Sequence, residues 1–501
     1  MKASDMKTMT VLKYSPLFAG LLLAGCSLAP AYKVPVVNTP AAFKEAAGQD
    51  WKTAQPADDK NRGQWWTVFG DSTLNTLETQ AQADNQDLKA AAARLAQSRA
   101  LRQAASSQWS PQVSAGFGPT REKPSPASLE LAPNAPTSSY TLWREQASVS
   151  YEVDLFGRVA SSVNAATADA QQNEALFQSV QLALQADVAQ AYFLLRELDA
   201  EEALYTNTVA SRTQTLDLLQ KRFAAGYTGE LDVARGQSEL ESAQAQALGL
   251  ARERADAEHA LAILLGKAPA DFALSANPLQ AVTVSIPAGL PSSLLERRPD
   301  IAAAERAMAA ANARIGEARA AFFPSLNITG ALGYESAQLS HISDWSSRTF
   351  LFGPLAGTML SLPLFDGGLR KAGVKQARAV YEEQVADYRQ TVLNSFREVE
   401  DGLADMRILG QQIQTQDAAV QAATHAANLS HRRYQEGSIG YLDVLEADRS
   451  VLLLQHDAVQ LNGQRALAAV GLIRALGGDW AVPEKTAAAQ NGTPVQLAKA
   501  Q

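Results

Sequence analysis

The stretch RFAAGYTGELDV, Arg222–Val233, recurs as RYQEGSIGYLDV, Arg433–Val444. Both copies contain an arginine, an aromatic residue, two glycines and a Leu-Asp-Val ending in the same order, and the second begins 211 residues after the first. Closely spaced glycines between helix-forming runs indicate a tight turn. The chain is therefore predicted to be an internal duplication, in which each half carries a tight turn between two long helices.

Long helices are predicted on both sides of each turn. Residues 158–225 contain neither glycine nor proline, which permits a helix of roughly 100 Å at 1.5 Å per residue. Residues 369–436 contain no proline. Returning helices are predicted over residues 230–265 and 441–475. Helices this long are typical of coiled-coil packing rather than of a globular core.

A shorter helix and a pair of strands are predicted before each long helix. A helix that Asp71 or Ser72 caps extends to about Gln108, and its counterpart begins near Pro299 and ends before Pro324. After each of these helices, alternating apolar and polar residues predict strands. The four predicted strands are Gln112–Gly118, Trp143–Val153, Leu326–Tyr334 and Phe350–Phe365.

These strands are apolar on one side and polar on the other. The pattern suits a membrane β-barrel, and it also suits a half-buried sheet in a soluble protein. Four strands cannot close a barrel, so the first interpretation requires an oligomer. Beyond the N-terminal segment, no apolar run is long enough for a membrane helix, so a membrane crossing would require a closed barrel.

The N-terminus has the pattern of a secretory signal. Three lysines precede a short apolar run, Leu17–Leu23, which is too short to span a bilayer. The following Leu-Ala-Gly-Cys, ending at Cys26, resembles the lipobox of bacterial lipoproteins, in which the cysteine is lipidated and becomes the first mature residue. Ser27 after the cysteine fits sorting to the outer membrane in such proteins. The alternative is an ordinary signal that happens to contain a cysteine.

The composition favours neither a nucleic-acid-binding protein nor an enzyme. The 44 basic and 52 acidic residues give a net charge of −8, and no basic cluster stands out. Cys26 is the only cysteine, which excludes an internal disulfide or a cysteine-based metal site. The five histidines form no HExxH pair, and His425 and His431 fall on different helical faces. No catalytic residue, cofactor or metal site is predicted.

The returning helix of the second half has a seven-residue repeat. One series runs from Leu445 to Ile473 and the other from Ala447 to Ala475, and together they bound a wide apolar face. Leu442, Glu446 and Arg449 fall on the opposite side. From spacing alone, the favoured interpretation of that side is a solvated face with a weak Glu446–Arg449 pair. Asp448 falls inside the apolar face, and Arg432 or Arg433 is its expected partner.

The assembled features resemble the outer-membrane efflux protein family, in particular the lipoprotein branch that serves resistance-nodulation-division pumps. The segments that carry the resemblance are Leu23–Cys26, Trp65–Trp66, Phe69–Asp71, Tyr151–Arg158, Arg297–Ile301, Phe322–Pro324, Leu364–Gly368 and the two turns. The resemblance implies an α+β membrane protein. Three protomers would each give four strands to one twelve-stranded outer-membrane barrel, which a long α-helical periplasmic tunnel continues.

The resemblance also assigns roles to the two turns. Leu442, Glu446 and Arg449 correspond to the residues that close the periplasmic end of the tunnel, with Glu446 where a relative has aspartate. The first copy leads instead into Leu231, Arg235 and Ser238, so the gate is expected on the second copy. The turns themselves are the expected docking sites for a periplasmic adaptor protein. These turn residues are Gly226, Tyr227, Thr228, Gly229, Gly437, Ser438, Ile439 and Gly440.

The function that the resemblance implies is a passive, gated duct in a tripartite efflux pump that exports small toxic compounds. Its expected partners are two further copies of the chain, the adaptor, the inner-membrane pump and outer-membrane lipid. A lipid attached to Cys26 would anchor the protein in the membrane. Two alternatives stay open: the duct of a type I protein secretion system, and a periplasmic coiled-coil scaffold lipoprotein. The expected divisions are a signal peptide (1–25), an extended lead-in (26–70), a first repeat (71–267), a linker (268–293), a second repeat (294–480) and a flexible tail (481–501).

Overall fold

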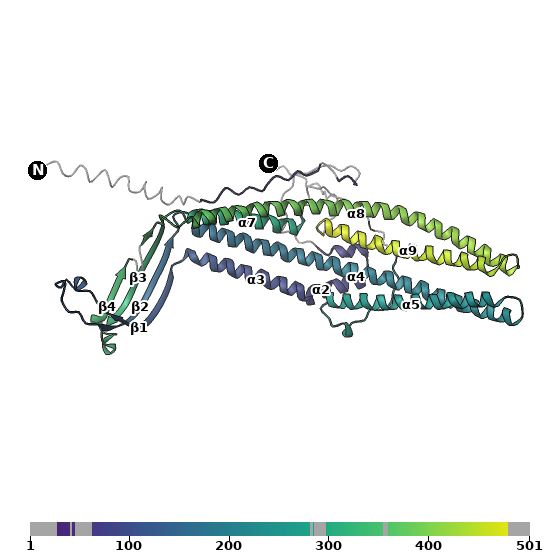
Figure 1. Cartoon of the computed structure of the whole chain (residues 1–501), viewed down its shortest axis with the longest axis horizontal. Helices are drawn as coiled ribbons and strands as arrows, with labels where there is room; N and C mark the ends of the chain where they lie inside the picture. Colours follow the sequence, from purple (N-terminus) through teal and green to yellow (C-terminus); the bar gives the residue numbers. More distant parts are fainter. Residues whose placement is uncertain are drawn as a thin grey trace, which may run out of the picture. The chain divides into compact units, whose positions relative to one another are not determined.

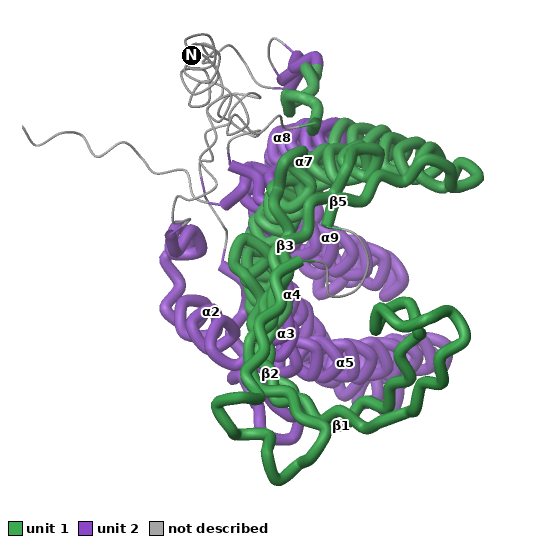
Figure 2. Tube along the Cα trace, turned by 90° about the vertical axis from the view of Figure 1, so that its left-hand side faces the viewer, with its two compact units in different colours: residues 1–37, 93–174, 303–390 green, residues 38–92, 175–302, 391–501 purple. Residues whose placement is uncertain are grey.

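The computed structural model describes residues 28–40, 43–45, 63–280, 284, 297–353 and 359–478. The predicted signal peptide, Cys26 and the C-terminal tail lie outside these residues. The chain divides into two compact units, each assembled from several segments (Figure 2). Unit 1 comprises residues 1–37, 93–174 and 303–390, and unit 2 comprises residues 38–92, 175–302 and 391–501.

The four predicted long helices are present (Figure 1). Helix α4 spans Arg158–Ala224 and α8 spans Leu369–Gln435, each of 67 residues. The returning helices are α5, Glu230–Leu264, and α9, Tyr441–Ala475. The seven-residue series of α9 is buried at its C-terminal end and half-buried in the middle, as expected for a helix that packs along its whole length.

The predicted single helix over residues 71–108 is wrong, because the chain breaks it at Asn85. Helix α2 spans Ser72–Asp84, and α3 spans Gln86–Ser106. Asn85 leaves the helical conformation, and its side-chain oxygen accepts the Leu88 backbone N–H at 2.9 Å, which caps α3. Its amide nitrogen donates to the Leu264 carbonyl at the end of α5, also at 2.9 Å. The break thus ties two helix ends together.

The core of unit 2 surrounds the two tryptophans before α2. Trp65 and Trp66 are buried against α4 and α5, and the indole N–H of Trp65 donates to the Gln185 amide oxygen at 2.9 Å. Asp71 caps α2 as predicted, accepting from the backbone N–H of Thr73 and of Leu74. Among the described residues, no helix has the length and apolar character needed to cross a membrane.

The strands form one antiparallel sheet in unit 1, in the order β1-β2-β3-β4, with β5 also paired to β3. Their bounds are β1 Gln112–Glu122, β2 Tyr140–Val153, β3 Ser325–Ser336, β4 Arg348–Phe352 and β5 Leu360–Ser361. The fourth strand was predicted as one run over 350–365, which is wrong. Among the described residues, β4 ends at Phe352, before Gly353 with its φ of 136°, and β5 ends at Ser361, so residues 362–365 are not in a strand.

An extended N-terminal segment, residues 28–37, which we call the N-terminal strap, lies along the part of helix α7 (Pro299–Ala320) that belongs to unit 1. The Leu28 and Pro30 carbonyls accept hydrogen bonds from Arg319 and Asn312 at 3.2 and 2.9 Å. Gly316 of α7 lies directly beneath the strap, because a Cβ at this position would be 2.6 Å from the Ala29 methyl group. The strap therefore runs antiparallel to α7, with Leu28 near the helix end that precedes β3.

Candidate functional site

The two repeated turns have the same backbone geometry. Gly226 and Gly437 end α4 and α8 with φ of 76° and 75°, a conformation that favours glycine. The next residues, Tyr227 and Ser438, donate their N–H groups five positions back, to the carbonyls of Arg222 and Arg433, both at 2.9 Å. This is the Schellman pattern of helix C-termini. The glycines that open the repeated stretch are therefore required by the turn.

The returning helices begin at the second glycine of each turn. Gly229 and Gly440 are the N-cap residues, in extended conformation. The aspartate of each Leu-Asp-Val sequence then stabilises the turn by a different contact. Asp443 accepts the Gly440 backbone N–H at 3.1 Å, whereas Asp232 accepts the Thr228 hydroxyl at 2.7 Å.

The side chains of the two turns differ more than their backbones. In the first copy Phe223, Tyr227 and Leu231 are 47%, 84% and 62% exposed. At the equivalent positions, the second copy has a half-buried tyrosine, the small polar Ser438 and Leu442, which is 43% exposed. The first turn therefore presents a larger exposed apolar surface, which includes its most exposed aromatic ring.

A small apolar cluster joins the helices next to the turns. Leu219 of α4, Tyr441 and Leu445 of α9 are buried together, and Val233 of α5 and Tyr434 of α8 pack against them. The guanidinium of Arg222 also lies over the Tyr434 ring, 4.9 Å from its centroid. All four long helices therefore contribute to one packed end, so that movement of α9 here must disturb its neighbours.

The three predicted gate residues follow this cluster along α9. Leu442 and Glu446 are exposed. Arg449 NH1 lies 3.3 Å from Glu446 Oε1, so the expected pair on one helix is present. The shorter contacts of Arg449 are with a different acid, because its Nε donates to Glu239 Oε1 of α5 at 2.9 Å and its NH2 donates to the same oxygen.

Glu239 is the residue that sequence reasoning missed. It is only 7% exposed, and it also binds Arg212 of α4, through an ion pair of 3.0 Å and a hydrogen bond of 2.6 Å to its backbone carbonyl. Two arginines from different helices thus share one buried carboxylate. A signal for it is present in the sequence of α5. Glu239 lies three residues after Gly236 and four before Ala243, so it shares their helical face, and that face is buried. We name Arg212, Glu239, Glu446 and Arg449 the gate cluster.

Two histidine–carboxylate pairs flank the gate cluster. Oδ1 of Asp448 in α9 lies 2.8 Å from Nε2 of His431 in α8, so the expected partner, Arg432 or Arg433, is wrong. At 100° per residue, those arginines point to other faces of α8 than His431 does. Further along α9, His456 lies 3.3 Å from the buried Glu201 of α4.

A second acid, Glu197, lies in the same seam between α4 and α9. A Cβ placed on Gly463 of α9 would be only 2.0 Å from a carboxylate oxygen of Glu197, so the glycine makes room for this side chain. Burial, and then the neighbouring charge of Glu201, raise the pKa of Glu197 to about 7. The seam therefore changes its charge near neutral pH.

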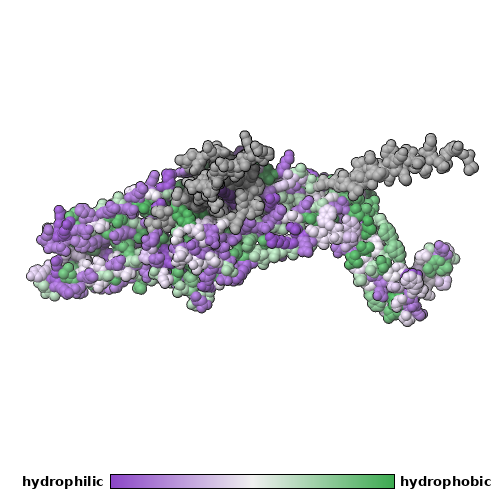
Figure 3. Space-filling view, turned by 180° about the vertical axis from the view of Figure 1, so that it is seen from behind, coloured by the Kyte–Doolittle hydropathy of each residue, from purple (hydrophilic) through white to green (hydrophobic). Residues whose placement is uncertain are grey.

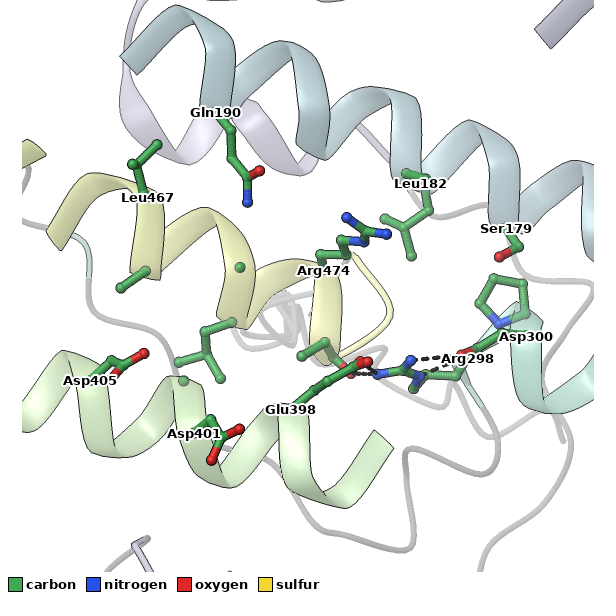
Figure 4. A pocket seen from close by; sticks show the side chains of 17 residues that line it. Ser179, Leu182, Gln190, Arg298, Asp300, Glu398, Asp401, Asp405, Leu467 and Arg474 are labelled. Atoms are coloured by element: carbon green, nitrogen blue, oxygen red, sulfur yellow. Dashed lines mark hydrogen bonds and ion pairs between the residues drawn. The ribbon is translucent and has the colours of Figure 1, made fainter. Parts of the chain in front are cut away.

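A cavity of about 550 Å³ opens between α4, α8 and α9 in unit 2 (Figure 4). At one end the buried Arg298 binds Asp300 and Glu398, at 2.6 Å each, and the Ala475 carbonyl at 3.1 Å. Asp401 and Asp405 line the other end. The Arg298 contacts hold the start of α7 against the end of α9, which is a structural role. The described residues contain no group of acids, histidines or cysteines suited to a metal.

The sheet presents two chemically different faces. On one face most of the exposed large side chains are apolar, with Arg121, Glu145 and Arg348 as charged exceptions, and Figure 3 shows apolar residues gathered over the strands. Members of this face are Val113 and Phe117 of β1, Val149 of β2, Leu332 of β3, and Phe350 and Phe352 of β4. On the other face, Ser114 and Ser148 join their hydroxyls at 2.8 Å across β1 and β2. An exposed apolar sheet face of this extent marks a surface that contacts lipid or another apolar partner.

Comparison with known proteins gives a consistent result over nearly the whole chain. The model of the outer membrane efflux protein family matches residues 77–267 and 290–478. The toluene efflux pump outer membrane protein TtgF of Pseudomonas putida is 34% identical over 472 residues, covering 93% of this chain and 97% of TtgF. OprJ of Pseudomonas aeruginosa is 34% identical over 469 residues, which cover 93% of this chain and 95% of OprJ. The cation efflux system protein CusC of Escherichia coli is 31% identical over 487 residues, which cover 94% of this chain and 100% of CusC.

Solved structures agree with the sequence comparison. A crystal structure of a membrane protein from Pseudomonas aeruginosa superposes with a TM-score of 0.81 at 33% identity, covering 90% of this chain and all of that one. The open state of the MtrE outer membrane channel of Neisseria gonorrhoeae gives a TM-score of 0.78 at 30% identity, covering 90% and 98%.

Proposed function

Because this chain belongs to the outer membrane efflux protein family, and so is the outer-membrane channel of an efflux pump, we propose that three copies form one duct with a gate on α9. The observation that carries the proposal is the gate cluster. Within one chain, Arg449 of the second sequence repeat is held by the buried Glu239 of the first sequence repeat. The duct is passive, and the inner-membrane pump supplies the energy.

A closed barrel of twelve strands accounts for the sheet. One chain contributes four strand positions, and β1 and β4 are open edges at either end of the strand order. Joining β4 of one copy to β1 of the next removes these edges, and the apolar face then contacts lipid while the polar face lines the duct. Heat-resistant trimers on SDS gels are the expected result, and a strictly monomeric protein in detergent would contradict it.

The repeated turns are the proposed docking sites for a periplasmic adaptor, which bridges to an inner-membrane resistance-nodulation-division pump. The two turns have the same backbone geometry, so each chain offers two similar surfaces. The exposed Tyr227 makes the surface of the first turn the more apolar one. Cross-linking from cysteines at Tyr227 and Ser438 tests this assignment. Adaptor captured from neither position would exclude the turns as its contact.

The N-terminal strap supports a lipid anchor on Cys26. Leu28 lies beside Arg319, one residue before the end of α7 and shortly before β3 begins. Cys26 precedes Leu28 by two residues in the sequence, and an extended chain spans at most about 3.6 Å per residue. An acyl chain there would enter the membrane near the bases of the strands. Metabolic labelling with a palmitate analogue should mark the wild-type protein and not Cys26→Ser.

The cargo proposed for the duct is small toxic compounds rather than proteins. TtgF is named for toluene efflux and CusC for cation efflux, and both are pump components of similar length to this chain. This kinship favours efflux over type I protein secretion and over a periplasmic scaffold. Purified protein in planar bilayers should form ion-conducting channels, and deleting its gene should increase sensitivity to exported compounds. Absence of both effects would overturn the proposed function.

A further inference from the structure

A cluster of three charged side chains lies on the polar face of the sheet. Arg144 of β2 lies between two acids on the neighbouring strands. Its NH2 is 2.6 Å from Glu122 of β1, its Nε is 2.9 Å from Glu335 of β3, and its NH1 donates to Thr120 at 3.1 Å. Three strands are therefore bridged by one guanidinium, which uses a different nitrogen for each acceptor.

The cluster lies at the end of the sheet away from the helices. Glu122 is the last residue of β1, and Glu335 is the last but one of β3, whereas both strands begin next to helix ends. The residues that share its face between the cluster and the strand bases are small or uncharged. They include Ser114, Gly116 and Gly118 of β1, Gln146, Ser148 and Ser150 of β2, and Thr329, Ala331 and Gly333 of β3.

The charges of the cluster do not cancel. Two carboxylates face one guanidinium, and all three side chains are about one third exposed. At the helix end of the same face, Glu152 is paired with Arg158 at 2.7 Å, so that position adds no net charge. Arg121 and Glu145, the neighbours of the cluster in sequence, point to the opposite face because side chains alternate along a strand. Lys123, just beyond β1, makes no ion pair with either acid in the part of the chain described here.

We propose that Glu122, Arg144 and Glu335 form a charge filter at the outer mouth of the duct, which favours cations over anions. This inference rests on the proposed barrel, in which the polar face lines the lumen. Each chain contributes a net charge of −1 at one level, and threefold repetition makes a ring of three such charges. Rings of acidic side chains select cations in channels.

The strength of the filter depends on ionic strength. In a wide mouth the charges act through water, and the Debye length is about 30 Å at 0.01 M salt and about 3 Å at 1 M. Cation preference should therefore be strong in dilute salt and vanish in concentrated salt. This salt dependence separates a charge ring from selection by pore diameter.

The test is the reversal potential of single channels in planar bilayers under a KCl gradient near 10 mM. The double substitution Glu122→Gln/Glu335→Gln leaves the guanidinium alone and should shift the reversal potential toward the chloride value. Arg144→Gln leaves two acids and should shift it toward the potassium value. The matched control is Glu145→Gln, the adjacent residue on the opposite face, which should leave it unchanged.

The outcomes are distinguishable from failure of the proposed function. If none of the proteins conducts, the channel proposal itself is wrong. If the variants conduct with the wild-type reversal potential, or if Glu145→Gln shifts it as much as the double variant does, the charge filter is wrong. Loss of heat-resistant trimers in Arg144→Gln together with unchanged selectivity would show that the cluster only joins strands, and would also overturn the filter.

Discussion

Arg449 of α9 donates two hydrogen bonds to the buried carboxylate of Glu239 on α5, 210 residues earlier in the chain. Glu446, one turn before Arg449, is exposed and lies 3.3 Å from it. An exposed pair contributes about 0.2–1 kcal/mol, and the Glu239 contact is the stronger of the two because its buried carboxylate accepts two N–H groups of Arg449. Closure of α9 against its neighbours therefore depends mainly on Glu239.

Replacing Glu239 should weaken the gate more than replacing Glu446. In Glu239→Gln, Arg212 and Arg449 lose the charge that they share, so α9 loses its ion pair with α5 and α5 loses its ion pair with α4. Cells that produce this variant should become permeable to a bulky antibiotic that wild-type cells exclude, as measured by growth inhibition. Glu446→Gln is the matched control and should retain wild-type resistance. Equal sensitivity of the two variants at equal outer-membrane abundance would refute the role of Glu239.

The stability of the seam between α4 and α9 should fall as pH rises. Burial beside Glu201 raises the pKa of Glu197 to about 7, from an ordinary value of 4.5. The folded protein therefore holds this proton more tightly than the unfolded chain does, and the free energy of unfolding decreases between about pH 4.5 and pH 7. The charged neighbour that acts on Glu197 is Glu201 on its own helix, and Glu201 in turn lies 3.3 Å from His456 of α9.

The measurement is the thermal unfolding midpoint of the protein in detergent at pH 5 and pH 8. Wild-type protein should lose stability over this interval, and Glu197→Gln, which cannot titrate, should lose less. Glu446→Gln serves as the control, since Glu446 is exposed and should leave the pH dependence as it is. A Glu197→Gln curve parallel to that of the wild type would exclude Glu197 as the titrating group.

Two glycines of α9 should respond in opposite directions to a methyl group. A Cβ on Gly463 would collide with Glu197, whereas a Cβ on Gly471 has open space within 4 Å. Gly463→Ala should therefore expel the Glu197 carboxylate from the seam and lower the thermal midpoint. Gly471→Ala should raise the free energy of unfolding by about 1 kcal/mol through helix propensity. If the two variants have the same stability, the close contact at Gly463 does not exist in solution.

Asn85→Ala should destabilise unit 2 although it leaves the apolar core intact. The substitution removes the N-cap of α3 and leaves the Leu264 carbonyl without its side-chain donor. The expected loss is about 1–2 kcal/mol of unfolding free energy, as for other caps. Chemical denaturation can be compared with Gln86→Ala, whose exposed side chain makes only a local bond to the Asp84 carbonyl. A loss no greater than that of Gln86→Ala would argue against the cap.

The sequence predicts the long elements well, because their signals are local. Absence of glycine and proline over residues 158–224 and the duplicated Gly-x-x-Gly turns decide the helical hairpins, and alternation decides β1, β2 and β3. Contacts between distant helices carry no such signal. The pairing of Glu239 with Arg449 depends on the phases of two helices about their own axes, and one residue of error rotates a side chain by 100°. The same limit explains why Asp448 has His431 as its partner rather than Arg432 or Arg433.

The most direct test of the central claim is the single-channel conductance of Arg449→Ala in planar bilayers, compared with wild type under the same salt and voltage. If Arg449 holds α9 closed, removing its guanidinium leaves both Glu239 and Glu446 without their partner on α9, and the conductance rises severalfold while trimers persist. A conductance equal to that of the wild-type channel, in a variant that forms normal trimers, would contradict the proposed gate.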